Sequence, residues 1–482
     1  MTKLPNQFLT KWINFWVFVF SASVLALNHH GGEAAIILLF TMVYIFITKN
    51  DDRSKYKLNG NEIIFITLVI LFWLLNLLNT LFQPEGLEFE NIRIAISAMD
   101  NPMRWLLMLP IFFLLRLYKL DWRLISIGLS VGVFISVGIA IYEVYFLGYS
   151  RATGGMNQAI TFGQLMVATD LLLWVFMIFA WNNNNKLLAT ILLIASLVAF
   201  YGSLLSVTRG AWLAYIFMIF SLVIYTIKRS IFNKNYLFSQ PVLLRIFLAF
   251  VVFFLVSQTA QYKTIEVRTV DTIKYVTSQG QSDIWGSEGL RVDIYRTAIE
   301  IARYFPFGVG TDNFRTGAKA VIILDAINNT NIEVRNEDNK VLDDDDLIGD
   351  IHKYRVLQSS TRGPLSDGAV GLNAGAAPNM GAIKFTSKMD HAHNEWLNVL
   401  AENGVAGIIL LTLLFAFPIK IFWQNLSHKN DLVGMYSYCG ILLTVSFAIF
   451  GQTESIFSSH AVVIFFIFFL FLIIAQISRL MR

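Results

Sequence analysis

Cysteine and charged residues are scarce in this sequence of 482 residues. The single cysteine, Cys439, has no second cysteine to pair with, which excludes a disulfide framework and a metal site built from cysteines. Charged residues make up only 15% of the chain and hydrophobic residues 56%, a larger apolar share than a soluble domain normally carries. The net charge of +4 is too small to indicate nucleic acid as a partner. An ordinary soluble protein is therefore excluded.

Long hydrophobic runs recur along the chain, each near the roughly 20 residues with which a helix crosses a membrane. The first run, after Lys3, lacks a clear cleavage site and is followed by more runs, so we interpret it as a helix and not as a signal peptide. Because only helices satisfy their own backbone so often in lipid, we predict an all-α polytopic membrane protein with about twelve transmembrane helices. The predicted spans are 9–27, 34–48, 62–82, 103–118, 123–147, 159–181, 187–206, 210–227, 242–259, 395–422, 434–451 and 461–478.

Lysine and arginine concentrate in alternate connections between these spans. One set includes Lys57, Arg116 and Lys119, whereas the short connections of the other set hold few basic residues. Basic residues favour the cytoplasmic side of short loops, so both termini are predicted to be cytoplasmic. The chain then divides into helices one to five (1–150), helices six to nine with arginine-bearing outer loops (151–259), one large outer loop (260–394) and the last three helices (395–482).

The large outer loop has two parts of different character. Its first part, GLRVDIYRTAIEIARYFPFGVGTDNF, repeats apolar residues at helical spacing and stops at Pro306, which predicts an amphipathic helix on or near the membrane surface. Its second part, 316–386, is polar and includes VLDDDDLIGD. We interpret that acidic run as solvated loop, because adjacent aspartates lack the alternating spacing of a calcium loop.

Ionisable residues gather where the predicted spans meet the outer side. In a membrane such residues are candidates for function. Each of these residues also has an ordinary structural interpretation when it is considered alone. Arg151 would be an interfacial arginine and Arg291 a solvated helix residue, whereas Glu454 would hold His460 or an arginine in place. The set comprises Arg151 in SRATGGMNQAITFGQ, Arg209 in SVTRGAWLAY, Arg291 and Arg296 in the loop helix, His391, His393 and Asn394 in DHAHNEWLNVL, and Glu454 and His460 in GQTESIFSSHAV.

Together these residues favour a site for an anionic, lipid-linked substrate that is open to the outer aqueous space. The planar fork of arginine matches phosphate oxygens, and the unpaired N–H groups at a helix start attract the same charge. A neutral histidine nearby is suited to general base catalysis. The pair His391 and His393 lacks a metal-binding spacing such as HExxH, so no metal site is predicted.

At this point the sequence resembles the superfamily of O-antigen ligases and polymerases, bacterial inner-membrane glycosyltransferases. In HNEWLNVLAENGVAG, His393 and Asn394 are followed by nine residues and then by a GxxG motif that begins at Gly404, as in that family. Arg209 and Leu213 form an RxxxL motif, and the loop helix with its Pro and Gly-x-Gly turn is also similar. The glycines of the signature fit close approach of helices in the membrane.

The resemblance implies transfer of a glycan from undecaprenyl diphosphate to an acceptor hydroxyl on the periplasmic side of the bacterial inner membrane. It implies that His393 is the base, that Arg209 and Arg291 hold the diphosphate, and that Arg151, Arg296, His391, Asn394 and Glu454 contribute to substrate binding. No cofactor or metal is implied, and membrane lipids surround the chain.

The identity of the acceptor is left open. A ligase would use lipid A–core, a polymerase a second lipid-linked glycan, and a third relative a serine or threonine of a protein. The intact His-Asn-x9-GxxG and RxxxL motifs favour the ligase. A transporter of lipid-linked sugar is disfavoured, because the sequence shows no internal repeat and its charges gather at one membrane face.

Overall fold

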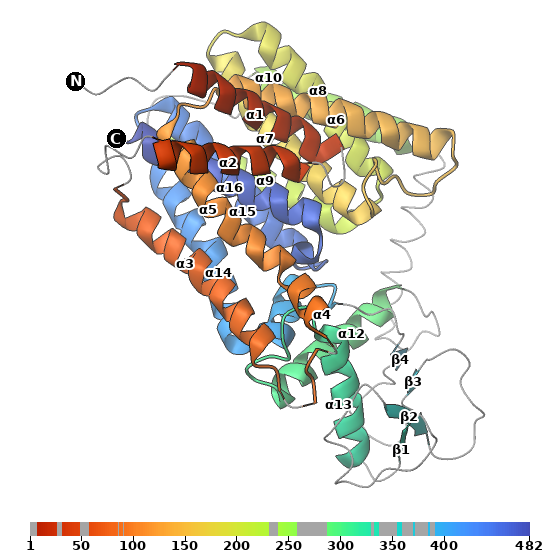
Figure 1. Ribbon diagram of the computed structural model, residues 1–482. Helices are drawn as coiled ribbons and strands as arrows, with labels where there is room; N and C mark the ends of the chain where they lie inside the picture. Colours follow the sequence, from red (N-terminus) through yellow and green to blue (C-terminus); the bar gives the residue numbers. More distant parts are fainter. Residues whose placement is uncertain are drawn as a thin grey trace.

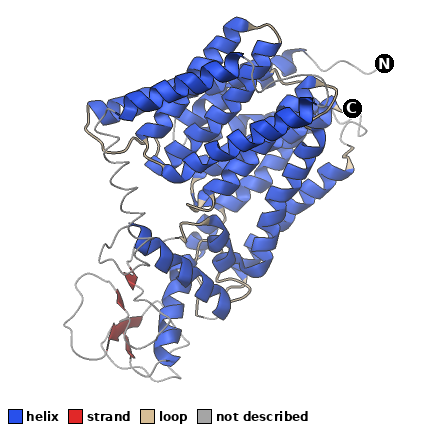
Figure 2. Cartoon of the chain, turned by 180° about the vertical axis from the view of Figure 1, so that it is seen from behind, coloured by secondary structure: helices blue, strands red, loops and turns tan. Residues whose placement is uncertain are grey.

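The computed structural model shows a bundle of long helices with smaller helices and short strands at one end (Figures 1 and 2). The structure describes residues 7–26, 31–48, 57–84, 86–89, 91–230, 240–257, 287–328, 332–336, 354–358, 370–371, 384–385 and 391–482. The run VLDDDDLIGD lies outside the described residues, and so does most of the polar segment 316–386.

Helices make up most of the described chain. They are α1 (Gln7–Ala26), α2 (Gly31–Thr48), α3 (Gly60–Leu81), α4 (Ile92–Ala98), α5 (Asp100–Leu117), α6 (Trp122–Tyr145), α7 (Ala159–Asn182), α8 (Lys186–Leu205), α9 (Arg209–Ser230), α10 (Gln240–Ser257), α12 (Ser287–Tyr304), α13 (Phe314–Asn328), α14 (Glu395–Asn425), α15 (Asp431–Phe450) and α16 (His460–Leu480), with a short 3₁₀ helix at Ile456–Ser458.

The prediction of helical membrane spans is confirmed, and each of the twelve predicted ranges overlaps one helix. By length and composition, eight described helices can cross a membrane: α1, α3, α6, α7, α8, α14, α15 and α16. Three shorter apolar helices lie within α2, α9 and α10. The count of twelve spans stays a prediction.

Short strands inside the predicted outer loop are an addition to the all-helical prediction. β1 (Ile332–Asn336) pairs antiparallel with β2 (Tyr354–Gln358), with Val334 opposite Val356. β3 (Val370–Gly371) pairs antiparallel with β4 (Lys384–Phe385). The strands could not be predicted from the composition of 316–386, because each strand is short and surrounded by polar residues.

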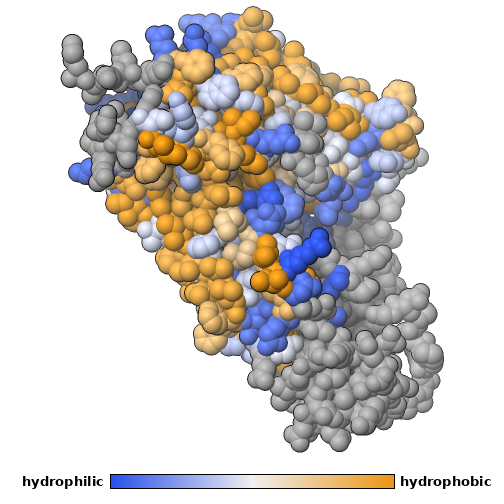
Figure 3. Space-filling view, in the orientation of Figure 1, coloured by the Kyte–Doolittle hydropathy of each residue, from blue (hydrophilic) through white to orange (hydrophobic). Residues whose placement is uncertain are grey.

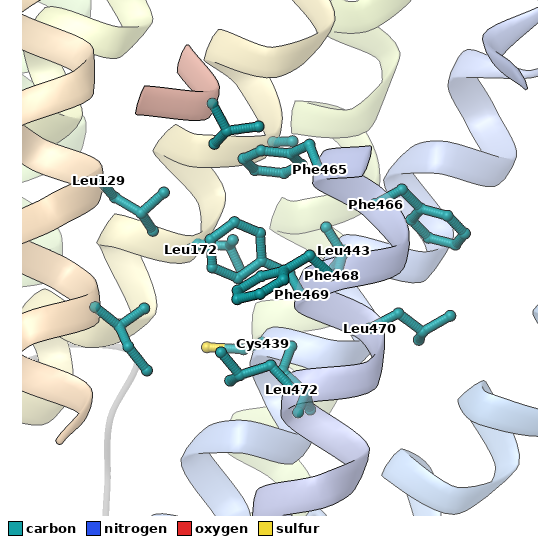
Figure 4. Close-up of a cluster of buried hydrophobic side chains, with 14 of the residues drawn as sticks. Leu129, Leu172, Cys439, Leu443, Phe465, Phe466, Phe468, Phe469, Leu470 and Leu472 are labelled. Atoms are coloured by element: carbon teal, nitrogen blue, oxygen red, sulfur yellow. The ribbon is translucent and has the colours of Figure 1, made fainter. Parts of the chain in front are cut away.

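The core of the bundle forms around α16, whose sequence is apolar on every side and is almost entirely buried. Phe466 stacks on Phe447 of α15, with ring centroids 4.6 Å apart, and meets Trp105 of α5 edge-on. Cys439 is buried and free, and it lies in a cluster of phenylalanine and leucine side chains, next to Leu472 (Figure 4). Burial accounts for this cysteine without any redox role.

Apolar side chains also cover the outside of the bundle. Exposed examples come from several helices, such as Ile47 of α2, Leu81 of α3 and Phe250 of α10. Figure 3 shows this hydrophobic surface over the bundle, with hydrophilic residues gathered toward the end that carries α4 and α12. A surface of this kind suits contact with lipid tails.

The end of the bundle farthest from α12 is closed by polar bonds, the first of which is buried. Arg116 of α5 forms a buried ion pair with Glu62 of α3, with Nε and Oε1 2.5 Å apart. Arg482 donates to the carbonyl of Lys57 at 2.6 Å, and Asn14 of α1 donates to the carbonyl of Lys119 at 3.0 Å. Segments predicted to share the cytoplasmic side therefore meet at one end.

A second buried ion pair, which the sequence analysis missed, lies within the bundle. Arg245 of α10 donates to Asp170 of α7 at 2.5 Å, and Tyr215 of α9 donates to the same carboxylate at 2.9 Å. Ser196 of α8 bonds the other carboxylate oxygen at 2.5 Å. Arg245 also lies over the ring of Trp174. Charge pairing and hydrogen bonds together satisfy groups that lipid would leave unsatisfied.

Helix α14 is broken at Gly404, where the backbone has φ 64° and ψ −162°. The break frees the carbonyl oxygens of Ala401 and Glu402. These oxygens accept hydrogen bonds from Val309 N at 3.1 Å and Gly310 N at 3.0 Å. Non-helical backbone is tolerated in a membrane helix where surrounding protein satisfies it, and the turn 305–310 does so here.

Glycine is required on both sides of this contact. Val405 N donates to the carbonyl of Pro306 at 3.2 Å, and a Cβ on Gly404 would lie 2.3 Å from the same oxygen. A Cβ on Gly308 would lie 2.2 Å from the carbonyl oxygen of Glu402. Close approach was therefore predicted correctly for Gly404, but its partner is a turn and not another helix.

The amphipathic loop helix is confirmed as α12, which ends before Pro306. Its apolar residues Ile294, Ala298 and Ile301 are fully buried, in a cluster with residues of α13 and α14. The apolar face of α12 therefore packs against protein, and the position of this helix on or near the membrane surface stays a prediction. Helix α13 was also missed, since the polar composition of 316–386 masked its apolar positions.

We expect Gly404→Ala to destabilise the protein, because the residue has a positive φ and its new methyl group would meet the Pro306 carbonyl. The cost is of order 1–3 kcal/mol, as for other strained backbone sites. Thermal unfolding in detergent, followed by tryptophan fluorescence, measures it. The control is Gly60→Ala in the first turn of α3, where no atom lies within 4 Å of the added Cβ. Equal melting temperatures for the two variants would contradict this account.

Candidate functional site

The candidate site forms where the start of α14 meets the segment 451–455 and helix α12. Asn394 is the N-cap of α14, and its side chain accepts from Trp396 N at 3.0 Å and Leu397 N at 3.2 Å. The same side chain donates to the carbonyl of Gln452 at 3.1 Å, while Glu395 N donates to the carbonyl of Gly451 at 2.7 Å. These bonds fix the helix start against the 451–455 segment.

His393 and Glu454 form the central pair of the site. Nδ1 of His393 lies 2.8 Å from Oε1 of Glu454, although 61 residues separate the two in sequence. The His393 side chain is 34% exposed and that of Glu454 only 9%. An ionised carboxylate can only accept, so Nδ1 of His393 carries a proton. When the ring is neutral, Nε2 keeps its lone pair and can accept a proton.

The backbone of His393 is strained, with a positive φ of 48°. Residues other than glycine rarely adopt this conformation, and strain of this kind is concentrated at functional sites. Tyr295 of α12 donates its hydroxyl to the His393 carbonyl at 3.3 Å, and His393 N donates to Nδ1 of His391 at 3.3 Å. Helix α12 thus contacts the histidine directly.

Arg291 and His391 complete the surroundings of Glu454. Arg291 lies 4.0 Å from Oε2 of Glu454 and is 28% exposed, while His391 lies 3.8 Å from Oε1. Burial raises the pKa of Glu454, but the hydrogen bond and charge of His393, with the charges of His391 and Arg291, outweigh it and lower the pKa below 4.5. Glu454 is therefore a carboxylate near neutral pH.

Arg209 starts α9 at the edge of this site. The next residue, Gly210, packs so closely on Thr453 that an added Cβ would lie 2.4 Å from the Thr453 hydroxyl. Arg209 is thus placed beside the segment that carries Glu454. Arg151 donates to the carbonyl of Ser206 at 3.0 Å, in the turn that leads into α9. The two arginines therefore lie on the same side of the bundle as His393.

Arg296 and His460 complete the set of predicted residues. Arg296 is on α12, and its side chain is exposed. His460 lies 2.8 Å from Oδ1 of Asn101 and 3.4 Å from the carboxylate of Asp100. Of the two interpretations of Glu454, a partner for an arginine fits Arg291, and a partner for His460 stays a prediction.

His391, His393 and Glu454 also form a group that has the composition of a metal site. One ligand atom from each lies within 4.8 Å of the others. This group could not be predicted from the sequence, because Glu454 comes from a segment distant from the two histidines. Imidazole and carboxylate ligands of this kind suit zinc or another divalent metal. The predicted absence of a metal therefore stays a prediction.

Comparison with known proteins gives a family and a relative. The family model described as O-Antigen ligase matches residues 194–343, which include Arg209 and Arg291. This match confirms the resemblance inferred from the sequence, although it ends before His393. A protein of Haemophilus influenzae (strain ATCC 51907 / DSM 11121 / KW20 / Rd), described as an uncharacterized protein, is 20% identical over 468 residues, covering 96% of this chain and 98% of the relative.

We expect Glu454→Gln to lower the melting temperature near neutral pH, by the equivalent of about 1–3 kcal/mol, because His393 and Arg291 lose a charged partner. The pKa of Glu454 is lowered in the folded protein, so its stabilising effect is present above pH 4.5 and is lost as the pH falls through the lowered pKa. Thermal unfolding at a series of pH values measures the difference from wild type, which should shrink below pH 4.5.

Glu300→Gln is the matched control, because Glu300 pairs with an exposed arginine, Arg303, on the surface of α12. Exposed pairs contribute about 0–1 kcal/mol, so this variant should stay close to wild type. If the difference in melting temperature between Glu454→Gln and wild type is independent of pH, the assignment of Glu454 as an ionised partner of His393 and Arg291 is contradicted.

Proposed function

From the match to the O-antigen ligase family, we propose that this chain is a glycosyltransferase that moves an oligosaccharide or polysaccharide en bloc from undecaprenyl diphosphate to an acceptor hydroxyl. The reaction takes place at the periplasmic face of the bacterial inner membrane and inverts the anomeric centre. The observation that carries the proposal is the His393–Glu454 pair with Arg291 beside it. No metal takes part.

His393 is the general base of the proposed reaction. Its Nδ1 is committed to Glu454, so Nε2 takes the proton of the acceptor hydroxyl. The acceptor oxygen forms a bond to the anomeric carbon while the bond from that carbon to the diphosphate oxygen breaks. Glu454 stabilises the imidazolium that results and holds the ring in the correct tautomer, as a carboxylate does for histidine in other enzymes.

Arg291 and Arg209 stabilise the leaving diphosphate. Negative charge develops on it as the glycosidic bond breaks, and fixed cations at that position lower the barrier. The guanidinium fork can bond two phosphate oxygens at once, which an ammonium group cannot do. Arg291 approaches from α12 and Arg209 from the start of α9, two elements that meet the segment around Glu454.

The remaining predicted residues receive supporting roles. Asn394 positions His393 by capping α14, and His391 packs against the His393 ring, with centroids 4.4 Å apart. Arg151 holds the turn before Arg209. Arg296 contributes positive charge on the exposed side of α12, where an anionic donor would approach.

We propose lipid A–core as the acceptor. The intact family motifs support this choice, and so does the description of the matching family as O-Antigen ligase. Polymerisation with a second lipid-linked glycan and transfer to a protein hydroxyl are the other outcomes of the first experiment.

His393→Ala should reduce transfer by about 10²–10⁴-fold, the usual contribution of a general base, while the protein accumulates normally. Membranes from cells making each variant are compared by staining their glycolipids and glycoproteins. Loss of long glycan on lipid A–core with lipid-linked polymer intact identifies a ligase. Collapse of the polymer to single repeats identifies a polymerase, and loss of glycoprotein identifies a protein glycosyltransferase.

His428→Ala is the matched control, because His428 lies in the turn after α14 at the opposite end of that helix. It should leave all glycans unchanged. If His393→Ala also leaves every glycan unchanged, the proposed mechanism is wrong.

A chelator should leave the rate of transfer by purified protein unchanged, because the arginines supply the positive charge at the leaving group. The assay uses EDTA and a zinc-selective chelator, with a magnesium-dependent enzyme treated in parallel to verify chelation. Inhibition that is reversed by added zinc, manganese or magnesium would contradict the metal-free mechanism. It would instead favour a metal bound by His391, His393 and Glu454.

A further inference from the structure

A polar cavity of about 260 Å³ lies next to His391, between the start of α14 and helices α3 and α5. His391 lines the cavity, and the centroid of its ring lies 4.4 Å from the centroid of the His393 ring. The cavity is slightly below the usual range of roughly 300–1,000 Å³ for ligand pockets, so it suits a single ring and not a chain. Nothing in the reaction described above uses it.

One face of α14 supplies the polar wall of the cavity. Glu395, Asn398 and Glu402 follow one another at spacings of three and four residues, which places them on the same side of the helix. All three side chains are buried. Buried carboxylates are costly in a membrane helix, and such residues usually face a ligand path or a partner.

The lining of the cavity differs from that of the proposed diphosphate site. Among the described residues that line it, none is lysine or arginine, while Glu395, Glu402 and Asp312 carry carboxyl groups and His391 and His460 carry imidazoles. A diphosphate would therefore lack the arginine forks that suit its oxygens. Groups that donate hydrogen bonds, such as sugar hydroxyls or an amine, would be bound by the carboxyl oxygens.

Aromatic side chains form the other walls. Trp105 of α5, Phe72 of α3 and Phe457 line the same cavity, and the ring of Trp105 meets the other two at centroid distances of 5.9 and 5.5 Å. A sugar ring has an apolar face of C–H groups and an edge of hydroxyls. It therefore matches a cavity that has aromatic faces on one side and carboxylates and amides on the other.

Some polar side chains of the cavity already have partners in the protein. Thr311 bonds Asn76 at 3.0 Å and Asn403 at 3.4 Å, so these amides help to fix the turn after α12. Glu395 accepts from Phe457 N through Oε2, and its other oxygen retains acceptor capacity.

Asn398 accepts from Ala392 N through Oδ1 at 2.9 Å, and Glu402 contacts Asp312 and Asn398. Recognition is therefore assigned to the remaining acceptor capacity of Glu395 and Glu402.

We propose that this cavity binds one hydroxyl-bearing sugar ring of a glycan substrate and holds it beside His393. The proposal rests on the function proposed above, since it assigns part of the substrate of the same site. Both glycan substrates contain sugar rings that offer hydroxyl or amine donors. The bound ring could therefore belong to the acceptor glycan, whose hydroxyl would point to His393, or to the first sugars of the donor glycan.

The test is a kinetic comparison of wild type with Glu402→Gln and Glu395→Gln, using purified protein, the lipid-linked glycan donor and lipid A–core acceptor. Loss of a buried hydrogen bond to a sugar hydroxyl should raise KM for one substrate about tenfold. A change in KM for the acceptor alone places the acceptor ring in the cavity, and a change for the donor alone places the donor ring there. A purely structural role would lower kcat and the melting temperature without this selectivity.

Direct binding keeps the test independent of catalysis. Two ligands are used, the delipidated acceptor oligosaccharide and the free donor oligosaccharide, both without diphosphate. Each is titrated against the His393→Ala protein and against the His393→Ala/Glu402→Gln protein. Binding is measured by saturation-transfer NMR. Glu300→Gln in the same background is the matched control. Selective loss of the signal in the Glu402 variant supports the proposal. Unchanged KM values together with unchanged binding overturn it.

If His393→Ala retains full transfer activity while Glu402→Gln weakens binding, the proposed mechanism fails but the sugar site stands.

Discussion

Backbone hydrogen bonds between the turn 305–310 and the break in α14 hold together the end of the molecule that carries α12. Val309 N and Gly310 N bond the carbonyl oxygens that the break frees, and Val405 N bonds Pro306. This contact fixes α12 against α14, and with it Tyr295 and Arg291 against His393 and Glu454. Neither Gly404 nor Gly308 tolerates a Cβ at its present separation. The turn therefore positions the candidate site, although none of these backbone groups takes part in the proposed reaction.

Two regions of different lining follow from that arrangement. Arg209, Arg291 and the start of α14 surround the position proposed for the diphosphate, whereas the cavity beside His391 is lined by carboxyl, amide and aromatic side chains. A substrate with an anionic end and a hydroxyl-rich end would be oriented by this difference, because the arginines favour the anionic end and the cavity offers hydrogen-bond acceptors to the hydroxyls. His391 lines the cavity, and its ring centroid lies 4.4 Å from that of His393.

The sequence predicted what depends on local composition and missed what depends on distant contacts. The helical spans could be predicted because apolar length is a local property, and α12 because its apolar spacing precedes Pro306. The pairing of His393 with Glu454 could not, because it joins residues 61 positions apart through the 451–455 segment. Asp170 and Arg245 were missed for the same reason, since a lone charge in an apolar run does not reveal its partner. Gly404 was identified, but only the structure shows that a turn fills the space.

The buried pair of Asp170 and Arg245 has a consequence for how the chain enters the membrane during synthesis. An arginine at the centre of an inserting helix costs roughly 2.5–3.5 kcal/mol, and the cost is smaller near the helix ends. Arg245 is near the start of α10, so it carries only part of that cost when α10 inserts alone. Its partner Asp170 precedes it by 75 residues and is supplied by α7, with Tyr215 from α9. These groups are synthesised before α10, so they are present to neutralise its arginine as that helix joins the bundle.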